Sequence, residues 1–342
     1  MGVFVHIIPG RRLPSSDKKM ILLNAKIGQA DIEQEATRKG YGQGILDLAV
    51  RDENIVVLTA DLAESTQVLD FAKAYPERFV ECGVAEQNMM GIAAGLALYG
   101  KTAFVSSYAV FSPGRSWDQF RVSVCYSMAN VKVVGAHTGV SVGPDGATHQ
   151  ALEDVAITRV LPNLIVEVPC DAIEARKTTV ALGKIKGPAY FRLGRSKTPI
   201  MTTNDTPFEV GKAYVMREGK DVAIIGSGPV LYNALLAAID MEKEGISVMV
   251  VNNHSIKPID AETIINAAKT CGAIVTIEEH QIMGGCGSAV CEVLAMNYPV
   301  PVEMLGMPNS FGESGQPEEL IKKYGMDKDA VIGAVKKVLK RK

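Results

Sequence analysis

The stretch VKVVGAHTGVSVGPDGATHQALEDVA, residues 131–156, contains the pattern that decides the fold of this chain. It begins with a nearly continuous apolar run, VKVVGA, and continues through a glycine-bearing loop into the helical pattern of LEDVA. A strand that is apolar at successive positions, not only at alternate ones, is typical of a parallel sheet covered on both faces. The stretch therefore predicts a buried parallel strand that opens into a polar loop.

Outward from this strand, short apolar runs alternate with longer amphipathic segments. Strand–helix–strand repetition predicts an α/β fold with mostly parallel sheets and helices on both faces. In the first part we expect strands at 54–62, 102–107, 131–137, 164–169 and 189–193, and helices at 36–52, 85–100, 116–129 and 170–185. In the second part we expect strands at 221–228, 247–253 and 273–280, and helices at 230–245 and 260–270.

A polar, proline-containing span separates the two parts, and a length of 342 residues suits two domains. We place the linker at residues 196–214, the first domain at 30–195 and a smaller second domain at 215–342. Residues 1–29 have no strong periodicity and are expected to form an N-terminal arm.

The composition excludes several classes of protein. A formal net charge of −2 gives no reason to expect nucleic acid or an anionic membrane as a partner. No apolar run approaches the ~20 residues of a transmembrane helix, and the opening MGVFVHIIPGRRLP is too short in its apolar part for a secretory signal. Six scattered cysteines without a CxxC pair indicate reduced thiols in a cytoplasmic protein.

The loop after the strand at 131–137 contains two histidines and an aspartate, His137, Asp145 and His149. Open α/β sheets bind their ligands at the carboxyl ends of strands, where His137 is expected. A lone histidine is most often structural, whereas this grouping favours binding of a polar substrate or proton transfer. Zinc is the alternative, but the spacing is not that of a compact zinc motif and no cysteine is near.

Glu86 lies in the first turn of the small-residue helix expected at 85–100. One interpretation is that it only interacts with the positive end of the helix dipole. The other is a carboxyl group against an apolar wall of Met89, Met90 and Ile92, with a raised pKa that lets it share a proton. The residues alone leave both interpretations open.

Two arginines are further candidates. Arg195 follows the strand expected at 189–193, where a guanidinium group could hold a phosphate through two hydrogen bonds, and Arg38 is a second candidate. A solvated surface charge is the alternative for each of them. The turn GSGPVL, residues 226–231, lacks the third glycine of the dinucleotide fingerprint, which counts against an NAD-linked oxidoreductase.

Nine motifs follow one another along the chain: TADLAEST, GVAEQNMMGIAAGLALYG, DQFR, GAHTGVSVGPDGATHQALEDVA, PNLIVEVPCD, RLGRSKTP, IKPID, EEH and GGCGSAV. In this order they resemble the C-terminal portion of transketolase, the thiamine diphosphate enzyme that transfers two-carbon ketol units between sugar phosphates. The resemblance runs from about Arg38 to about Leu339. It implies that 30–195 is a pyrimidine-binding domain and 215–342 a transketolase C-terminal domain.

The resemblance implies how the cofactor is held. Glu86 matches the glutamate that hydrogen-bonds the aminopyrimidine ring and so promotes loss of the thiazolium C2 proton. Tyr108 and Phe111 match the aromatic wall against the pyrimidine, although the family usually has phenylalanine where this chain has Tyr108. Gly114 stands where many microbial members have tyrosine. Asp61 matches an aspartate near the cofactor and the subunit contact.

The resemblance also implies how the substrate is held. Asp145 and His149 match residues that bind donor and acceptor hydroxyl groups near the reacting carbons, and His149 is expected to be catalytic. The implied sugar-phosphate clamp consists of Arg38, Ser65, His137 and Arg195.

A complete transketolase also has a pyrophosphate-binding domain with a Gly-Asp-Gly motif and paired asparagines, and this sequence lacks that combination. The resemblance therefore implies a split enzyme of the pentose phosphate pathway, with this chain as its C-terminal subunit. An N-terminal partner subunit would supply the diphosphate site and its Mg²⁺ or Ca²⁺, and no metal ligand is expected on this chain. The expected assembly is a heterotetramer with two copies of each subunit.

Two thiamine enzymes remain alternatives: the beta subunit of a 2-oxo acid dehydrogenase and the C-terminal part of deoxyxylulose-phosphate synthase. The histidines and arginines favour sugar phosphates over an oxo acid. A non-catalytic binding or regulatory module is the alternative from another class, and Glu86 counts against it.

Overall fold

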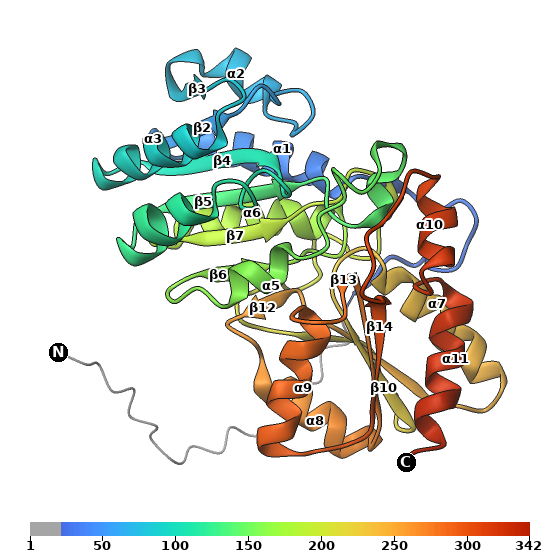
Figure 1. The fold of residues 1–342 in the computed structure, drawn as a ribbon. Helices are drawn as coiled ribbons and strands as arrows, with labels where there is room; N and C mark the ends of the chain where they lie inside the picture. The colour runs from blue at the N-terminus through green and yellow to red at the C-terminus, as the bar shows by residue number, and fades with distance from the viewer. Residues whose placement is uncertain (1–21) are drawn as a thin grey trace.

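The computed structural model describes residues 22–342 and shows two α/β domains stacked on each other (Figure 1). Residues 1–21 lie outside the described residues; they include most of the expected N-terminal arm 1–29 and the opening segment considered as a secretory signal. Within residues 22–342, no helix is long and apolar enough to cross a membrane. All six cysteines are free.

The first domain is built on a seven-stranded sheet with the order β12-β6-β7-β5-β4-β2-β3. The six strands from β3 to β6 pair in parallel, and β12 runs antiparallel to β6. The strands are β2 (Ile55–Thr59), β3 (Phe79–Glu81), β4 (Thr102–Tyr108), β5 (Val131–Ala136), β6 (Ile165–Glu167), β7 (Ala189–Arg192) and β12 (Ser255–Lys257).

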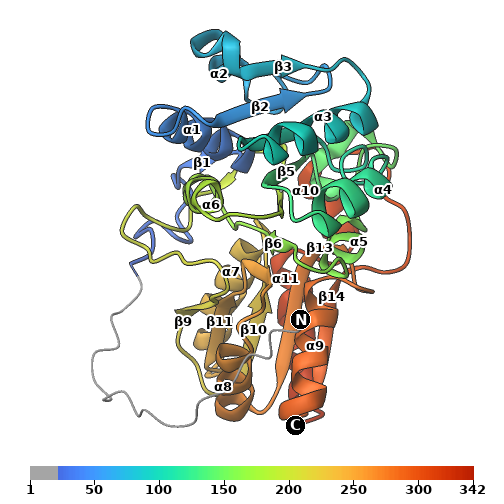
Figure 2. The same ribbon diagram turned by 90° about the vertical axis from the view of Figure 1, so that its left-hand side faces the viewer.

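Helices cover both faces of this sheet, as Figure 2 shows. In β4, Phe104 packs into the apolar cluster under α1 and α6, and the next residue, Val105, packs into the cluster under α3. Burial on both faces explains why the strands are apolar at successive positions. The helices are α1 (Thr37–Ala49), α2 (Leu69–Ala74), η1 (Pro76–Arg78), α3 (Glu86–Leu98), α4 (Trp117–Gln119), η2 (Phe120–Tyr126), η3 (Val140–Asp145), α5 (Asp154–Arg159) and α6 (Ala172–Lys184).

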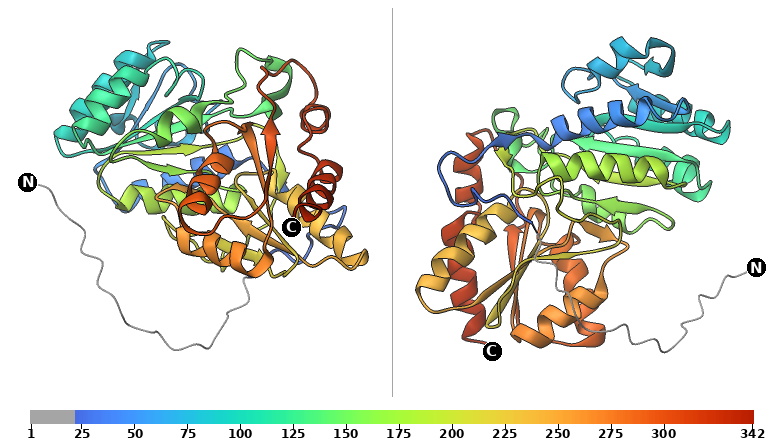
Figure 3. Two further views of the ribbon diagram at one scale, coloured as in Figure 1. Left: turned by 60° about the horizontal axis from the view of Figure 1, so that its bottom comes forward. Right: turned by 180° about the vertical axis from the view of Figure 1, so that it is seen from behind.

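Two of these helices, α1 and α6, run side by side on one face of the sheet (Figure 3). Gly40 of α1 allows this close approach, because a Cβ atom there would lie 1.9 Å from the Ala172 carbonyl oxygen. On the other face, the continuous helix expected at 116–129 is instead a short α-helix followed by a π-helix. The apolar pattern of the segment fits either form, so the sequence could not reveal the change.

The second domain has a five-stranded sheet with the order β14-β13-β10-β11-β9, parallel except that β9 runs antiparallel to β11. Helix α7 packs beside α11, and α8 packs beside α9. The strands are β9 (Tyr214–Arg217), β10 (Val222–Gly226), β11 (Val248–Asn252), β13 (Ile274–Gln281) and β14 (Val302–Met307). The helices are α7 (Leu231–Lys243), α8 (Ala261–Cys271), α9 (Cys286–Asn297), α10 (Pro317–Lys323) and α11 (Lys328–Leu339). The structure thus confirms the α/β fold expected from the sequence.

The two domains share strands as well as a linker. Strand β12 comes from the second part of the chain but extends the sheet of the first. A small antiparallel pair, β1 (Gln34–Glu35) and β8 (Thr198–Pro199), joins the start of the first domain to the connecting segment. Strand β12 and the β1–β8 pair therefore hold the two domains together in addition to the linker.

Candidate active site

The carboxyl ends of the parallel strands in the first sheet bring several candidate side chains to one edge. Asp61 follows β2, Tyr108 ends β4, His137 follows β5 and Arg195 follows β7. Asp61 and His137 have positive φ angles of 59° and 56°. Such angles are uncommon outside glycine and concentrate at functional positions. Four other non-glycine residues among residues 22–342 also have positive φ angles, so the backbone supports this edge as a candidate site only together with its side chains.

Aromatic rings and the two histidines form the centre of the cluster. The Tyr108 and His137 rings stack with their centroids 3.8 Å apart. The His149 ring lies edge-on to Phe111 at 5.5 Å and to Tyr108 at 6.0 Å. The structure thus brings together residues that lie as far as 41 positions apart in the sequence, and it places both histidines against the ring pair.

Glu86 is the first residue of α3, and its side chain is 2% exposed. Met89 and Met90 are fully buried beside it on the same helix, as the apolar-wall interpretation expects. The surroundings are not wholly apolar, however, because Arg115 Nη1 donates a hydrogen bond of 2.9 Å to Glu86 Oε2. The Arg115 guanidinium also lies over the Phe111 ring, 4.6 Å from its centroid.

Arg115 therefore occupies a space bounded by a carboxylate and an aromatic ring. The guanidinium group is planar, donates to the carboxylate and stacks on the ring. Because its side chain is 49% exposed, it can leave this position without unfolding the domain. Another planar group that donates hydrogen bonds would satisfy the same two surfaces.

The basic residues lie beside the histidines. Arg195 Nη1 donates to the Val142 carbonyl oxygen at 2.7 Å and to Asp145 Oδ1 at 3.3 Å. Arg38 Nη1 donates to the Ser65 carbonyl oxygen at 2.7 Å. Burial, followed by the charge of Arg195, lowers the pKa of Arg38. Two cations that disfavour each other across a small distance form a natural site for an anion.

His137 is neutral in this environment. Burial, and then the charges of Arg38, Arg195 and His149, lower the pKa of His137 to about 3. Its Nδ1 atom is buried and has no hydrogen-bond partner within residues 22–342. A buried polar atom without a partner costs stability, so an unpaired nitrogen at a strand end suits a ligand hydroxyl group.

Asp145 is the last residue of the 3₁₀ helix η3, and His149 lies in the loop that follows it. Asp145 is partly exposed, at 31%, and Thr148 Oγ1 lies 2.9 Å from His149 Nδ1. Asp61 lies at the neighbouring strand end with its side chain exposed, and its backbone N–H donates to Glu81 Oε1 at 2.7 Å.

Two residues of the edge were missed by the sequence reasoning. Glu81 accepts hydrogen bonds from the backbone of Asp61 and of Gly83, at 2.7 and 2.9 Å, and so fixes the turns on both sides of it. Arg115 stands four positions after Phe111, a spacing that could have suggested a cation beside that ring. Within residues 22–342, no group of three or more His, Cys, Asp or Glu side chains is placed to hold a metal ion.

Comparison with known proteins decides the family. The model of the transketolase pyrimidine-binding domain matches residues 33–201, and that of the transketolase C-terminal domain matches residues 211–331. A putative transketolase C-terminal section from Methanocaldococcus jannaschii is 43% identical over 307 residues, which cover 89% of this chain and 96% of that protein. The chain belongs to the transketolase family.

Further comparisons show which kind of transketolase sequence this is. One of the subunits of the apulose-4-phosphate transketolase from Phocaeicola vulgatus is 40% identical and is covered over 98% of its length, with 90% of this chain. A solved structure described as a split gene transketolase, inactive beta4 tetramer, has a TM-score of 0.83 and 46% identity, covering 91% of this chain and all of that one. This transketolase chain is similar to the C-terminal subunits of split enzymes.

The transketolase family implies thiamine diphosphate as the cofactor, and the residues at this edge fit its aminopyrimidine half. Glu86 offers a buried carboxylate, Phe111 offers a ring face, and the Arg115 guanidinium already shows that a planar donor fits between them. The Tyr108 and Phe111 rings are stacked with their centroids 6.1 Å apart.

Proposed function

We propose that this chain is the C-terminal subunit of a thiamine diphosphate-dependent transketolase that moves a two-carbon ketol unit from a ketose phosphate to an aldose phosphate. The observation that carries the proposal is a continuous set of contacts that starts at the buried Glu86. Arg115 lies between the Glu86 carboxyl group and the Phe111 ring. The Phe111 ring contacts His149, and the Tyr108 ring beside it stacks on His137. A cofactor half-site and a polar substrate half-site thus adjoin at one edge of the sheet.

Thiamine diphosphate, when bound, supplies the carbon nucleophile that the reaction requires. Glu86 hydrogen-bonds the aminopyrimidine ring and holds the proton that is shared with its ring nitrogen. Its burial excludes water from that hydrogen bond and so strengthens it. Tyr108 and Phe111 orient the ring by stacking, and Asp61 lies where the resemblance places a residue near the cofactor.

The remaining candidates act on the sugar. Neutral His137 can donate to or accept from a substrate hydroxyl group, because its lowered pKa keeps it uncharged near neutral pH. His149 is the proposed catalytic residue that moves a proton at a hydroxyl group near the reacting carbons, and Asp145 binds such a group beside it. The proposed phosphate clamp consists of Arg38, Ser65, His137 and Arg195.

The substrate class follows from the charge of this clamp. Two arginines within electrostatic range of each other suit a phosphate dianion, whereas an unphosphorylated sugar has no charge to pair with them and a 2-oxo acid has a single negative charge. Two similar subunits are named for sugars with an anionic group, one for apulose 4-phosphate and one for 6-deoxy-6-sulfo-D-fructose, which supports an anionic sugar as the substrate class. We infer pentose phosphates as the substrates, within the pentose phosphate pathway and the cytoplasm.

The proposed partner is an N-terminal subunit with the pyrophosphate-binding domain, which holds Mg²⁺ or Ca²⁺ against the diphosphate. The outer face of α3 is suited to receive it. A Cβ atom at Gly91 or Gly95 would meet nothing within 4 Å, and Leu98 and Tyr99 are 68% and 86% exposed. Exposed apolar side chains grouped at one end of a helix are typical of a protein interface.

The exposed face of α3 continues to Gln87 and Asn88, next to the buried Glu86 that begins the helix, so a partner bound along this face would reach the end of the helix at which the site lies. We propose a heterotetramer with two copies of each subunit. The similar split gene transketolase in its beta4 form is described as inactive, which supports a need for the second subunit.

Reconstitution tests the proposal. Mixing this chain with the N-terminal subunit, Mg²⁺ and thiamine diphosphate is expected to yield ketol transfer from xylulose 5-phosphate to ribose 5-phosphate, followed as sedoheptulose 7-phosphate formation. Each subunit alone serves as the control and should be inactive. Decarboxylation of a 2-oxo acid by the mixture, without ketol transfer, would contradict the proposed function.

A further inference from the structure

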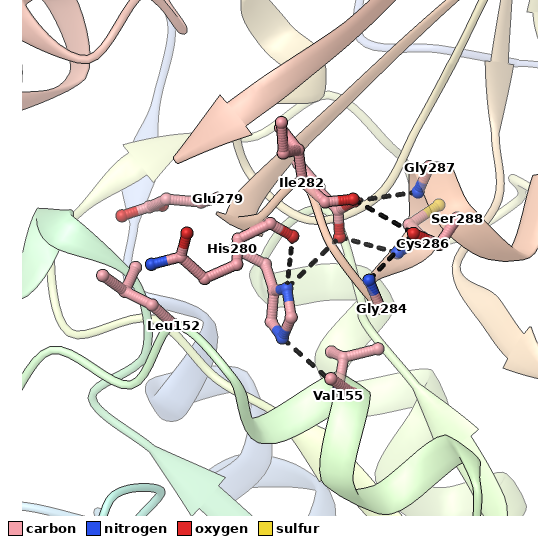
Figure 4. A network of polar contacts seen from close by, with 12 residues as sticks. Leu152, Val155, Glu279, His280, Ile282, Gly284, Cys286, Gly287 and Ser288 are labelled. Atoms are coloured by element: carbon pink, nitrogen blue, oxygen red, sulfur yellow. Dashed lines mark hydrogen bonds and ion pairs between the residues drawn. The ribbon is translucent and has the colours of Figure 1, made fainter. Parts of the chain in front are cut away.

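The loop with Asp145 and His149 is held from the second domain. Glu279 lies near the end of β13 in that domain and is 6% exposed. Its Oε1 atom accepts the backbone N–H of Ser141 at 2.5 Å, across the domain boundary. Figure 4 shows the Glu279 side chain pointing away from His280 and Cys286. The carboxylate is therefore directed at the loop of the other domain and not at its own neighbours.

The loop is shaped to receive this carboxylate. Gly139 has a φ of +77°, and a Cβ atom there would lie 2.2 Å from Glu279 Oε1. No other residue type could take this conformation and leave space for the glutamate. The Gly139 backbone thus leaves the space that the Glu279 side chain occupies at the first turn of the loop.

The same strand also holds the far end of the loop. The backbone N–H of Gln281 donates to the Leu152 carbonyl oxygen at 2.8 Å. Arg192, which is buried, donates through Nη2 to the Ala151 carbonyl at 3.0 Å and to the Glu279 carbonyl at 2.8 Å. Strand β13 therefore anchors the loop at both ends, and a displacement of one anchor would be transmitted to the residues between them.

Those residues are the proposed sugar-binding group. Asp145 and His149 lie inside the anchored segment, and the Val142 carbonyl in it accepts the hydrogen bond from Arg195. Glu86, Tyr108 and Phe111 lie outside it, on α3 and around the end of β4. The anchoring thus acts directly on the sugar half of the site and reaches the cofactor half only through the edge contacts of His149 with Tyr108 and Phe111.

We propose that Glu279 is a positioning residue of the second domain that sets the loop 139–150 for sugar binding. The inference rests on the proposed function, because it assigns Asp145, His149 and Arg195 to the sugar phosphate. A carboxylate is a stronger acceptor for a backbone N–H than a neutral group, so its charge contributes to holding the loop.

The neighbouring glutamate provides a matched control. Glu278 is also buried, at 3% exposure, and also accepts backbone N–H groups, from Cys286 at 2.7 Å and Gly287 at 2.8 Å. Both partners lie at the start of α9 in the same domain, away from the loop. Loss of Glu278 should therefore reproduce the structural cost of losing Glu279 without moving the sugar-binding residues.

The test uses the reconstituted two-subunit enzyme with E279A, E279Q and E278A. In E279A, the KM for the ketose and aldose phosphates should rise about tenfold with kcat changed less, while the Kd for thiamine diphosphate stays within about twofold. E279Q keeps an acceptor oxygen but no charge, so its KM should rise about threefold. E278A should lower the melting temperature and leave both KM values unchanged.

Amide hydrogen exchange in the isolated chain gives a second readout. Faster exchange of the peptide containing Ser141 is expected in E279A and E279Q, and no change there in E278A. KM values within about 1.5-fold of wild type in E279Q, or a rise in the cofactor Kd that matches the rise in KM, would overturn the proposal. If E279A does not fold, the KM values and the amide exchange of E279Q test the proposal. If the wild-type mixture shows no ketol transfer, the proposed function fails; unchanged exchange at Ser141 in E279Q overturns the inference by itself.

Discussion

The two domains have similar parallel sheets, yet they use the carboxyl ends of their strands in different ways. At the edge of the first sheet, Asp61 is exposed and Tyr108 and His149 are only partly buried. At the edge of the second, Asn252 and His254 are at most 1% exposed and are hydrogen-bonded to the first domain. One edge is open to a ligand, and the other is closed by protein.

The comparison shows that polar residues at strand ends do not by themselves mark a binding site. His254 Nδ1 lies 2.8 Å from Glu167 Oε2, and Asn252 Nδ2 donates to Glu174 Oε1 at 2.7 Å. These partners satisfy one polar atom of each side chain, whereas Asn252 Oδ1 and His254 Nε2 are buried without a hydrogen-bond partner among residues 22–342. The closed edge therefore differs from the open one mainly in being covered by the first domain. We therefore expect substitutions at the open edge to reduce activity and substitutions at the closed edge to reduce stability.

The largest effect is expected for Glu86→Gln at the open edge. Glutamine has nearly the same size but cannot share a proton with the aminopyrimidine ring, so kcat should fall by at least about a hundredfold. The measurement is ketol transfer by the reconstituted enzyme at saturating cofactor. E278Q at the closed edge is the control and should keep kcat within about threefold. A rate for Glu86→Gln close to that of wild type would rule out the assigned role.

The open edge could be predicted largely from the sequence because its signals are local. Apolar runs located β2, β4 and β5 to within a few residues, and Asp61, Tyr108 and His137 lie at the carboxyl ends of these three strands. The parallel arrangement then places the strand ends together. The resemblance added roles to positions that periodicity had already selected, such as His137 and Glu86.

The closed edge and the polar pairs of the open edge that join distant segments could not be predicted, because both depend on contacts between residues far apart in the sequence. Strand β12 joins the first sheet from the second part of the chain, which periodicity cannot show. The pairing of Arg115 with Glu86 crosses 29 positions and depends on the turn between β4 and α4. Glu279 has the same sequence signature as Glu278, and only the structure shows that one is directed at the loop and the other at α9.

Two histidines, one from each edge, should respond to pH in opposite directions. The folded-state pKa of His137 is lowered to about 3 by burial and by neighbouring cations. For His254, burial opposes protonation, but the carboxylates of Glu174 and Glu167 raise its pKa overall. His137 therefore stabilises the fold above its unfolded pKa of about 6.5 and loses that contribution as pH falls toward 3. His254 contributes fully below about 6.5 and loses its contribution as pH rises through its folded pKa.

Urea unfolding of the isolated chain between pH 5 and 8 tests this difference. His137→Asn should flatten the fall in stability between pH 6.5 and 5, by about 1 kcal/mol per pH unit. His254→Asn should instead flatten the fall above pH 6.5. Wild-type chain at each pH is the reference for both. Parallel pH profiles for the two variants would show that the two edges are not electrostatically different.

The smallest effect is expected for Arg115→Met, which tests whether Arg115 competes with the cofactor at the open edge. The Arg115 guanidinium now occupies the space between Glu86 and Phe111, so the aminopyrimidine ring must displace it to reach the carboxylate. A half-exposed ion pair is worth at most about 1 kcal/mol, and its removal should tighten cofactor binding by up to about fivefold. Methionine keeps the apolar contact with the ring, and Arg115→Lys, which keeps the charge, should bind the cofactor as wild type does. Titration of the reconstituted enzyme with thiamine diphosphate gives both Kd values. Weaker binding by Arg115→Met would mean that the arginine contacts the cofactor and does not compete with it, in which case the open edge presents a preformed cation as well as a preformed carboxylate.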